Sequence, residues 1–219
     1  MDPLVRTART TGLLYLGLAI AGGLGFLLVR PLVLDPGDPA ATLTDLRLAR
    51  IGVALELLIA LTQALAAWWF YRLFRVVEPV GAFGVAVFGM ANAVMVLGSA
   101  ALLGTAVESA AAGRGEVALL HLVSDNIWGV SGIFFGLWLV PMGVCVLRSG
   151  WLPLPLGWVL MAGGAGYVVS AFLRYLAPDV PVLAEVLVIP ASIGEFWVIG
   201  YLLFRGVRRS ASAPVPSAT

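Results

Sequence analysis

The stretch Val80–Val107, VGAFGVAVFGMANAVMVLGSAALLGTAV, contains no charged side chain. A helix that crosses a bilayer needs about 20 mostly apolar residues, so this stretch is long enough to span the hydrocarbon core once. Working outward along the chain, we find five further stretches of the same character. The six predicted spans are Thr11–Val29, Leu48–Tyr71, Val80–Val107, Asn126–Leu147, Leu156–Tyr175 and Val182–Phe204.

The composition excludes most other classes of protein. Of the 219 residues, 61% are hydrophobic and 11% are charged, and the mean hydropathy is +1.01. Soluble domains have about 45–50% apolar and about 25% charged residues, and disordered chains are richer still in charge. The single cysteine, Cys145, excludes a disulfide scaffold, and a net charge of +1 gives no footprint for nucleic acid. We therefore predict an all-α, polytopic membrane helix bundle.

The connections between the spans are short, so we predict one transmembrane domain over residues 1–209 and a disordered cytoplasmic tail over 210–219. The segment Gly115–Asp125 is a candidate for a separate interfacial helix. A single straight helix from Glu116 to Leu147 would be about 48 Å long, which exceeds the hydrocarbon core of about 30 Å.

The arginines predict the orientation. Six spans place both termini on one side, and cytoplasmic segments carry an excess of basic residues. With both termini in the cytoplasm, eight arginines lie inside (6, 9, 72, 75, 148, 205, 208 and 209) and five outside (30, 47, 50, 114 and 174). All basic residues are arginine, and the chain is rich in Ala, Gly, Val and Pro. This composition is typical of a GC-rich bacterial genome, so we expect a bacterial inner-membrane protein with both termini cytoplasmic.

Three carboxyl groups are the candidate catalytic residues. Glu195 lies ten residues before Arg205, which places it about 15 Å into a core of about 30 Å, near the midplane. Glu56 falls in the outer third and Asp125 at the outer edge, so the three acids describe a polar funnel that closes on Glu195. Burial favours the neutral form of a carboxyl group, which can donate a proton. Glu195 is then the general acid, with Glu56 or Asp125 as its partner.

Each acid also has a structural interpretation. Glu195 could be a protonated acid that hydrogen-bonds to a neighbouring helix. Glu56 could form an ion pair with Arg47 or Arg50 near the interface, and Asp125 could be simply solvated there.

The candidate substrate-binding residues are polar groups and aromatic rings along the same path. They are Arg50, Gln63, Asn92, His121, Trp128, Phe134, Trp138 and Trp197. The alternatives are hydrogen bonds between helices for the amides, solvation for the histidine, and core or lipid-facing packing for the aromatic rings. Because the chain has one histidine and one cysteine, we expect no metal site and no cofactor.

The sequence also resembles an uncharacterised bacterial integral-membrane family, domain of unknown function 4386, over nearly its whole length. The most specific matches are Phe134-Phe135-Gly136, Arg148-Ser149-Gly150-Trp151-Leu152-Pro153 and Gly194-Glu195, and Arg9, Tyr15 and Arg50 fall on further matching positions. Leu154-Pro155 departs from the family pattern, in which a basic residue follows the proline. The resemblance implies a compact multi-helix membrane domain and no particular activity.

Three functions remain open at this point. The first is an intramembrane enzyme that protonates a hydrophobic isoprenoid or lipid substrate, such as a cyclase or isomerase. The second is a small proton-coupled transporter with Glu195 as its proton site, and the third is a non-enzymatic accessory protein. The expected partners are the lipid bilayer and a hydrophobic small molecule, with no nucleic acid and an open oligomeric state.

Overall fold

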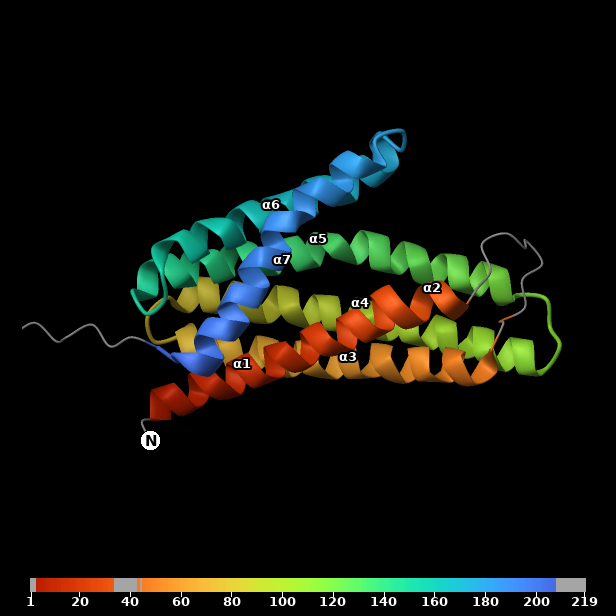
Figure 1. The fold of residues 1–219 in the computed structure, drawn as a ribbon, viewed down its shortest axis with the longest axis horizontal. Helices are drawn as coiled ribbons and strands as arrows, with labels where there is room; N and C mark the ends of the chain where they lie inside the picture. The colour runs from red at the N-terminus through yellow and green to blue at the C-terminus, as the bar shows by residue number, and fades with distance from the viewer. Residues whose placement is uncertain (1–2, 34–42, 44, 208–219) are drawn as a thin grey trace, which may run out of the picture.

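The computed structural model describes residues 3–33, 43 and 45–207, and these residues form helices joined by short turns. The elements are α1 (Pro3–Gly22), the π-helix η1 (Gly23–Val29), α2 (Arg30–Val33), α3 (Leu46–Phe74), α4 (Pro79–Ala111), α5 (Val117–Ser149), α6 (Leu154–Leu176) and α7 (Pro181–Phe204) (Figure 1). The first three run on as one helical span, Pro3–Val33. Six helices are therefore long and apolar enough to cross a membrane, and the predicted all-α, six-span fold class is confirmed.

Local sequence signals account for where the helices begin and end. The Asp45 carboxylate caps α3 by accepting hydrogen bonds from the backbone N–H groups of Arg47 and Leu48. Glu78 caps α4 in the same way at Gly81 N. Gly150 has a φ of +64°, a left-handed conformation that glycine adopts without strain, and it ends α5 before the turn into α6.

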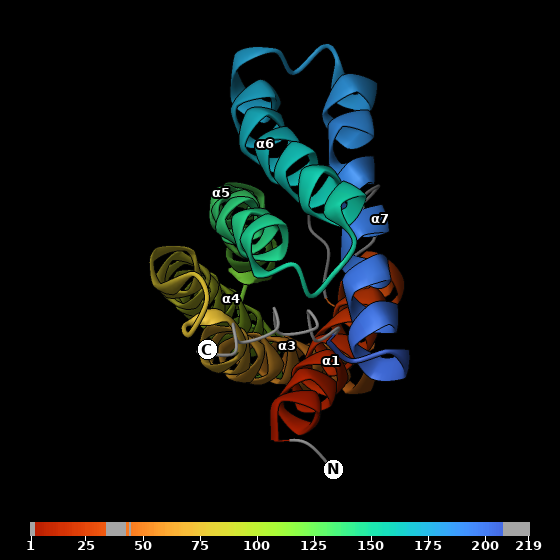
Figure 2. The ribbon, with the colours of Figure 1, turned by 90° about the vertical axis from the view of Figure 1, so that its left-hand side faces the viewer.

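The helices form a closed ring in which each packs against the next. Helix α3 contacts α4, α4 contacts α5, α5 contacts α6, α6 contacts α7, and α1 closes the ring by contacting α3 and α7. Figure 2 views this arrangement along the bundle and shows the α6–α7 hairpin leaning away from the other helices. Gly206 lies beside Val5, so α7 finishes where α1 starts. We call this end of the bundle the near end, and the opposite end, which contains Arg30, the far end.

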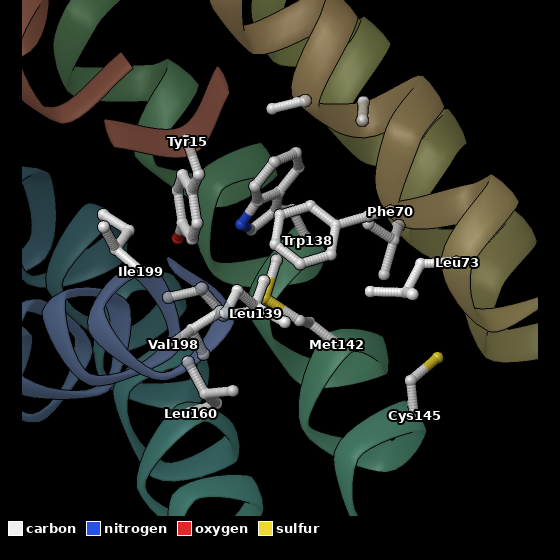
Figure 3. Close-up of a cluster of buried hydrophobic side chains, with 14 of the residues drawn as sticks. Tyr15, Phe70, Leu73, Trp138, Leu139, Met142, Cys145, Leu160, Val198 and Ile199 are labelled. Carbon is white, nitrogen blue, oxygen red and sulfur yellow. The ribbon is translucent and has the colours of Figure 1, made fainter. Parts of the chain in front are cut away.

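Aromatic side chains fill the middle of the ring. Tyr15, Phe70 and Trp138 are buried and meet edge to face, with ring centroids 5.3 to 5.7 Å apart (Figure 3). Gly89 makes room for the largest of them, because a Cβ atom there would lie 2.4 Å from Trp138 Cε3. The centre of the bundle is therefore a packed core and not an open pore.

Large apolar side chains cover the outside of the helices. Leu27, Val80, Phe83 and Phe204 are each more than half exposed in the bare protein. Such a surface is suited to lipid tails, because a soluble protein rarely exposes contiguous apolar patches of this extent. Together with the six spans, it makes the chain a multi-pass membrane protein.

Two details differ from the sequence-based expectations. The separate interfacial helix expected over 115–125 is not formed, because the chain from Val117 onward is the first part of the continuous helix α5. At 33 residues, α5 is about 50 Å long and extends beyond a hydrocarbon core of about 30 Å. The first span also continues past its expected end at Val29, as far as Val33. The predicted tail 210–219, with Arg208 and Arg209, lies outside the described residues.

Candidate functional sites at the far end and in the middle of the bundle

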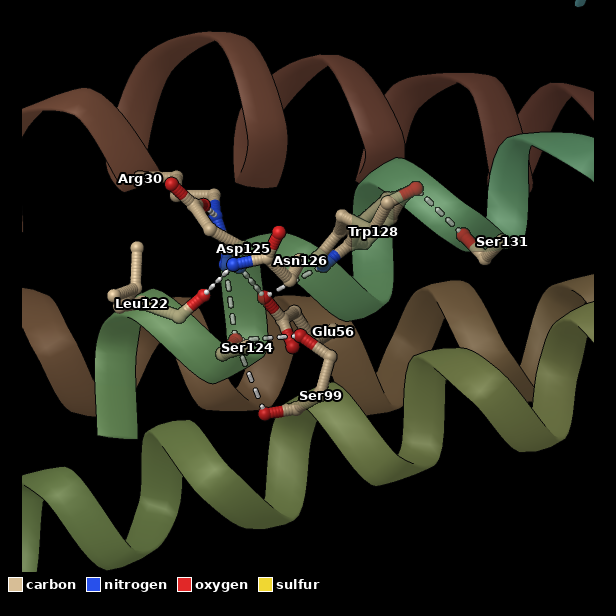
Figure 4. A network of polar contacts seen from close by, with 9 residues as sticks. All are labelled: Arg30, Glu56, Ser99, Leu122, Ser124, Asp125, Asn126, Trp128 and Ser131. Atoms are coloured by element: carbon tan, nitrogen blue, oxygen red, sulfur yellow. Dashed lines mark hydrogen bonds and ion pairs between the residues drawn. The ribbon is translucent and has the colours of Figure 1, made fainter. Parts of the chain in front are cut away.

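Arg30 is the centre of a buried ionic cluster at the far end. It directly follows the π-helix η1, and its side chain is only 8% exposed. Its guanidinium donates from Nε to Asp125 Oδ1 at 2.8 Å, from Nη2 to Ser124 Oγ at 2.9 Å, and from Nη1 to Glu56 Oε1 (Figure 4). One arginine thus connects the first span to α3 and α5.

Further polar side chains surround these groups. The indole of Trp128 donates from Nε1 to Glu56 Oε1 at 3.2 Å. The hydroxyl groups of Ser99 and Ser124 lie 2.7 Å apart and bring α4 into the network. We call the six residues Arg30, Glu56, Ser99, Ser124, Asp125 and Trp128 the Arg30 cluster.

The cluster leaves some hydrogen-bonding capacity unused. Within the described residues, the buried Oε2 of Glu56 has no hydrogen-bond partner. The same holds for Nε2 of His121, which lies one helical turn before Asp125. Taking ions out of water costs several kcal/mol each, so a buried ionic group in a membrane helix usually marks a function.

A hollow of about 140 Å³ opens next to the cluster. Phe26 of η1 and Arg174 of α6 line it together with Asp125, Trp128 and Gly129 of α5. The Phe26 and Trp128 ring centroids lie 5.1 Å apart, and the Asp125 side chain is 43% exposed. The ionic cluster can therefore be reached from the surface through Asp125.

A second hollow at the far end is shallower and larger, at about 560 Å³, and contains Arg50 and Glu108. Arg50 is exposed there and does not contact the Arg30 cluster through any hydrogen bond or ion pair between described residues. The sequence left open an ion pair of Glu56 with Arg47 or Arg50, but the structure pairs Glu56 with Arg30 instead.

Glu195 lies midway along α7 and belongs to a different site. Tyr15 Oη donates a hydrogen bond of 2.5 Å to Glu195 Oε1, and the Tyr15 ring packs on Phe70 and Trp138. Glu195 itself is half-buried, and neither hollow described above includes it. Its inner side thus faces a filled aromatic core, where the sequence had suggested the bottom of a funnel.

The structure brings Glu56 and Asp125 together on Arg30 but keeps Glu195 apart from them. Tyr15, the partner of Glu195, and Arg30, the partner of Glu56, lie fifteen residues apart on one helical span. This spacing corresponds to about 20 Å along the helix axis.

The other candidate residues are distributed over the core and the surface. Gln63 and Asn92 are buried, and Gln63 Oε1 and both amide atoms of Asn92 have no partner within the described residues. Trp138 is in the core, Phe134 is half-buried, and Trp197 is 38% exposed on the lipid-facing side of α7. In the part of the chain that the structure describes, no three His, Cys, Asp or Glu side chains are grouped so as to hold a metal ion.

Sequence reasoning missed Arg30, Tyr15, Ser124 and Arg174. Arg30 is followed by Pro31, a pair that is typical of a helix end, so the sequence placed it in an outer loop. Proline is also tolerated in the first turn of a helix, and α2 begins at Arg30. The signal that could have located Arg30 is the long apolar run before it, because a run of that length allows the helix to continue through the arginine.

The filled core, the lipid-facing surface and the far-end ionic cluster define the chain as an integral, multi-pass membrane protein with an interior charged site. It belongs to the family described as domain of unknown function 4386, whose model matches residues 10–206. No curated protein and no solved structure matches the chain.

Proposed function

We propose that this protein binds a hydrophobic small molecule with a polar end, which the Arg30 cluster and the adjoining hollow recognise. The observation that carries the proposal is the exposed carboxylate of Asp125, held at the mouth of an otherwise buried ionic cluster. An ion pair that served packing alone could be fully enclosed, whereas here one member faces a hollow lined with aromatic rings.

The chemistry of the hollow is suited to an amphiphile. Phe26 and Trp128 supply apolar ring surface, and Asp125 and Arg174 supply one charge of each sign. Sites for small molecules are mostly apolar, with a few polar groups that fix the orientation of the ligand. A membrane-dissolved molecule can enter such a site sideways from the lipid.

The proposal includes a location in the bacterial cell membrane, with the far end outside and both termini in the cytoplasm. Of the arginines in the described residues, six lie in or beside the near-end segments (6, 9, 72, 75, 148 and 205) and five at the far end (30, 47, 50, 114 and 174). An excess of basic residues marks the cytoplasmic side. The ligand would then reach the site from the outer leaflet.

The test compares molecules that co-purify with the full chain and with Asp125→Asn, which removes the exposed charge while keeping the shape of the side chain. Organic extracts of both proteins are compared by mass spectrometry with a detergent blank. We expect a molecule that is enriched in the wild-type extract and reduced about tenfold in the Asp125→Asn extract. A tenfold loss of affinity corresponds to about 1.4 kcal/mol, which is the order expected for one charge-assisted hydrogen bond. Glu185→Gln, at an exposed acid on α7, is the matched control. Equal retention by wild type and Asp125→Asn would contradict the proposal.

A second candidate function is acid catalysis at Glu195 on an isoprenoid or lipid substrate, as in a cyclase or isomerase. The observation that favours it is the hydrogen bond from Tyr15 to a carboxyl group at mid-membrane. Aromatic rings beside an acid can stabilise a cationic intermediate. This function needs a substrate that displaces core side chains or approaches Glu195 from the lipid side.

Glu195→Gln tests the second candidate. We expect it to abolish turnover of a lipid-extract substrate without changing what the Arg30 cluster retains. Tyr15→Phe, which removes only the hydroxyl group that contacts Glu195, is the matched variant. Unchanged turnover in Glu195→Gln would rule out this role.

The other two functions, a proton-coupled transporter and a non-enzymatic accessory protein, stay predictions. A polar path that is open on both sides of the membrane would favour the transporter, and a hollow that holds no ligand would favour the accessory protein.

A further inference from the structure

The hollow beside the Arg30 cluster presents two charges of opposite sign that the protein leaves partly unpaired. Asp125 Oδ1 accepts from Arg30, but Oδ2 takes part in no hydrogen bond within the described residues. Arg174 is exposed and forms no hydrogen bond or ion pair with any described residue. Both side chains line the same hollow. Asp125 can accept a hydrogen bond from a cationic group there, and Arg174 can donate one to an anionic group.

Gly129 leaves room for the guanidinium of Arg174 beside α5. A Cβ atom built on Gly129 would be 2.8 Å from Arg174 Cζ and from its Nη1. The guanidinium of Arg174 therefore lies directly over the backbone of α5, one turn after Asp125. A larger residue at position 129 would therefore make the end of the Arg174 side chain shift away from α5.

Two aromatic rings lie beside Asp125 in the part of the hollow that is suited to a cation. Phe26 and Trp128 line the hollow together with Asp125. The hydrogen bond from Trp128 Nε1 to Glu56 anchors the indole. An ammonium group is attracted both by a carboxylate and by the face of an aromatic ring, tryptophan above all.

The depth of the hollow is suited to a lipid headgroup. Helix α5 is about 20 Å longer than a core of about 30 Å, so about 10 Å of helix extends from each face if the helix is centred. Asp125 lies eight residues after Val117, or about 12 Å from the far end of α5. The carboxylate is therefore at the boundary where lipid headgroups meet acyl chains.

From this charge complementarity we infer that the hollow binds the headgroup of a zwitterionic phospholipid. The lipid's ammonium group lies against Asp125, Phe26 and Trp128, and its phosphate accepts hydrogen bonds from Arg174. The acyl chains stay in the bilayer, because a hollow of about 140 Å³ has room for a small polar group only. The inference rests on the proposed function and names the class of its ligand.

The experiment measures lipid retention by the full chain with native mass spectrometry. The protein is released from nanodiscs that contain equal amounts of phosphatidylethanolamine, which has an ammonium group, and phosphatidylglycerol, which has the phosphate alone. We expect wild type to retain phosphatidylethanolamine about tenfold over phosphatidylglycerol. Asp125→Asn should lose this preference, and Arg174→Gln should weaken retention of both lipids about tenfold.

Two further variants separate the site from general effects. Gly129→Ala leaves both charges in the protein but shifts the Arg174 guanidinium, so it should weaken retention of both lipids, by less than Arg174→Gln does. Arg47→Gln removes an exposed arginine at the same end and should retain lipids as wild type does.

The outcomes separate this inference from the proposed function. Equal retention of the two lipids by wild type, or an unchanged preference in Asp125→Asn, would overturn the inference. If Asp125→Asn instead released a different amphiphile from the purified protein, the proposed function would stand and the zwitterionic lipid would be wrong. If no variant changed any bound molecule, both would fail.

Discussion

At the scale of single residues, Arg30 determines how the far end is held together. Its guanidinium bonds to α3 through Glu56 and to α5 through Ser124 and Asp125. Removing one partner of a buried ion pair leaves the other charge unpaired, which costs more than the intact pair contributes.

We predict that Arg30→Met lowers the free energy of unfolding by about 3–5 kcal/mol, because Glu56 is left as an unpaired buried acid. Combining Arg30→Met with Glu56→Gln should recover a large part of this loss. Thermal unfolding of the purified protein in detergent measures both. Arg47→Met, at an exposed arginine, is the control and should change stability by less than about 0.5 kcal/mol. An unchanged midpoint in Arg30→Met would show that the cluster contributes nothing to the fold.

Glu78 and Arg148 form a second ion pair, at the near end and outside the proposed site. Arg148 Nη1 donates to Glu78 Oε2 at 2.6 Å, and this hydrogen bond lowers the pKa of Glu78 below its ordinary value. A carboxyl group whose pKa is lower in the folded state stabilises the protein above its unfolded pKa, and this stability is lost as the pH falls through the folded pKa.

The comparison of wild type with Glu78→Gln at two pH values tests this sign. We expect wild type to unfold at the higher temperature at pH 7, the difference to shrink as the pH falls below the unfolded pKa of about 4, and the difference to disappear once the pH has fallen through the lower folded pKa of Glu78. Glu116→Gln, at an exposed acid in a loop, should show no such pH-dependent difference. A difference that grew toward low pH would contradict the assignment.

At the scale of elements, small residues set the approach of α6 to its neighbours. A Cβ atom on Gly163 would lie 2.3 Å from the backbone nitrogen of Ala191 in α7. One on Gly136 would lie 2.4 Å from the carbonyl oxygen of Gly164. The glycine patches of the sequence are therefore used within the chain, as close helix contacts that only glycine permits.

We predict that Gly163→Ala destabilises the protein by at least about 1–3 kcal/mol, because the clash is with backbone and no side chain can move to relieve it. Gly200→Ala on α7 is the matched control, since a Cβ atom there meets nothing within 4 Å. It should leave stability unchanged or raise it by up to about 1 kcal/mol through helix propensity. Equal midpoints for the two variants would mean that α6 and α7 do not pack as described.

The spans could be predicted from sequence, but the sites only in part. Length and hydropathy alone are enough to identify a membrane helix, so all six spans were found. The direction of Arg30 depends on η1, whose i to i+5 hydrogen bonds change the angular position of every later side chain. The apolar sequence GLGFLLV carries no signal of such a turn. The contact of Tyr15 with Glu195 joins the first and last spans, so it depends on the ring order of the helices, which hydropathy does not encode.

At the scale of the whole molecule, a ring of six helices with a filled centre separates two polar sites. Along the first span, α3 and α5, the core residues Tyr15, Phe70 and Trp138 lie between the near end and the Arg30 cluster. A continuous water path through the bundle would have to displace these rings. The hollow beside the Arg30 cluster lies between η1, α5 and α6.

The orientation in the membrane is tested by cysteine labelling. In a Cys145→Ala background, we expect Glu116→Cys at the far end to react with a membrane-impermeant maleimide on intact spheroplasts. Val76→Cys at the near end, also an exposed loop position, should react only after lysis. The opposite pattern would place the hollow on the cytoplasmic side and contradict the proposed entry of the ligand from the outer leaflet.

The central claim, that the far-end hollow holds an amphiphile, is tested most directly by photo-crosslinking in native membranes. Phe26, which lines the hollow, is replaced by benzoylphenylalanine, and Phe83, a lipid-facing residue of α4, is replaced in a control protein. After illumination, mass spectrometry of the intact protein should show one dominant adduct at position 26 that is lost in combination with Asp125→Asn, against a mixture of bulk lipids at position 83. The same mixture of adducts at both positions would contradict the account.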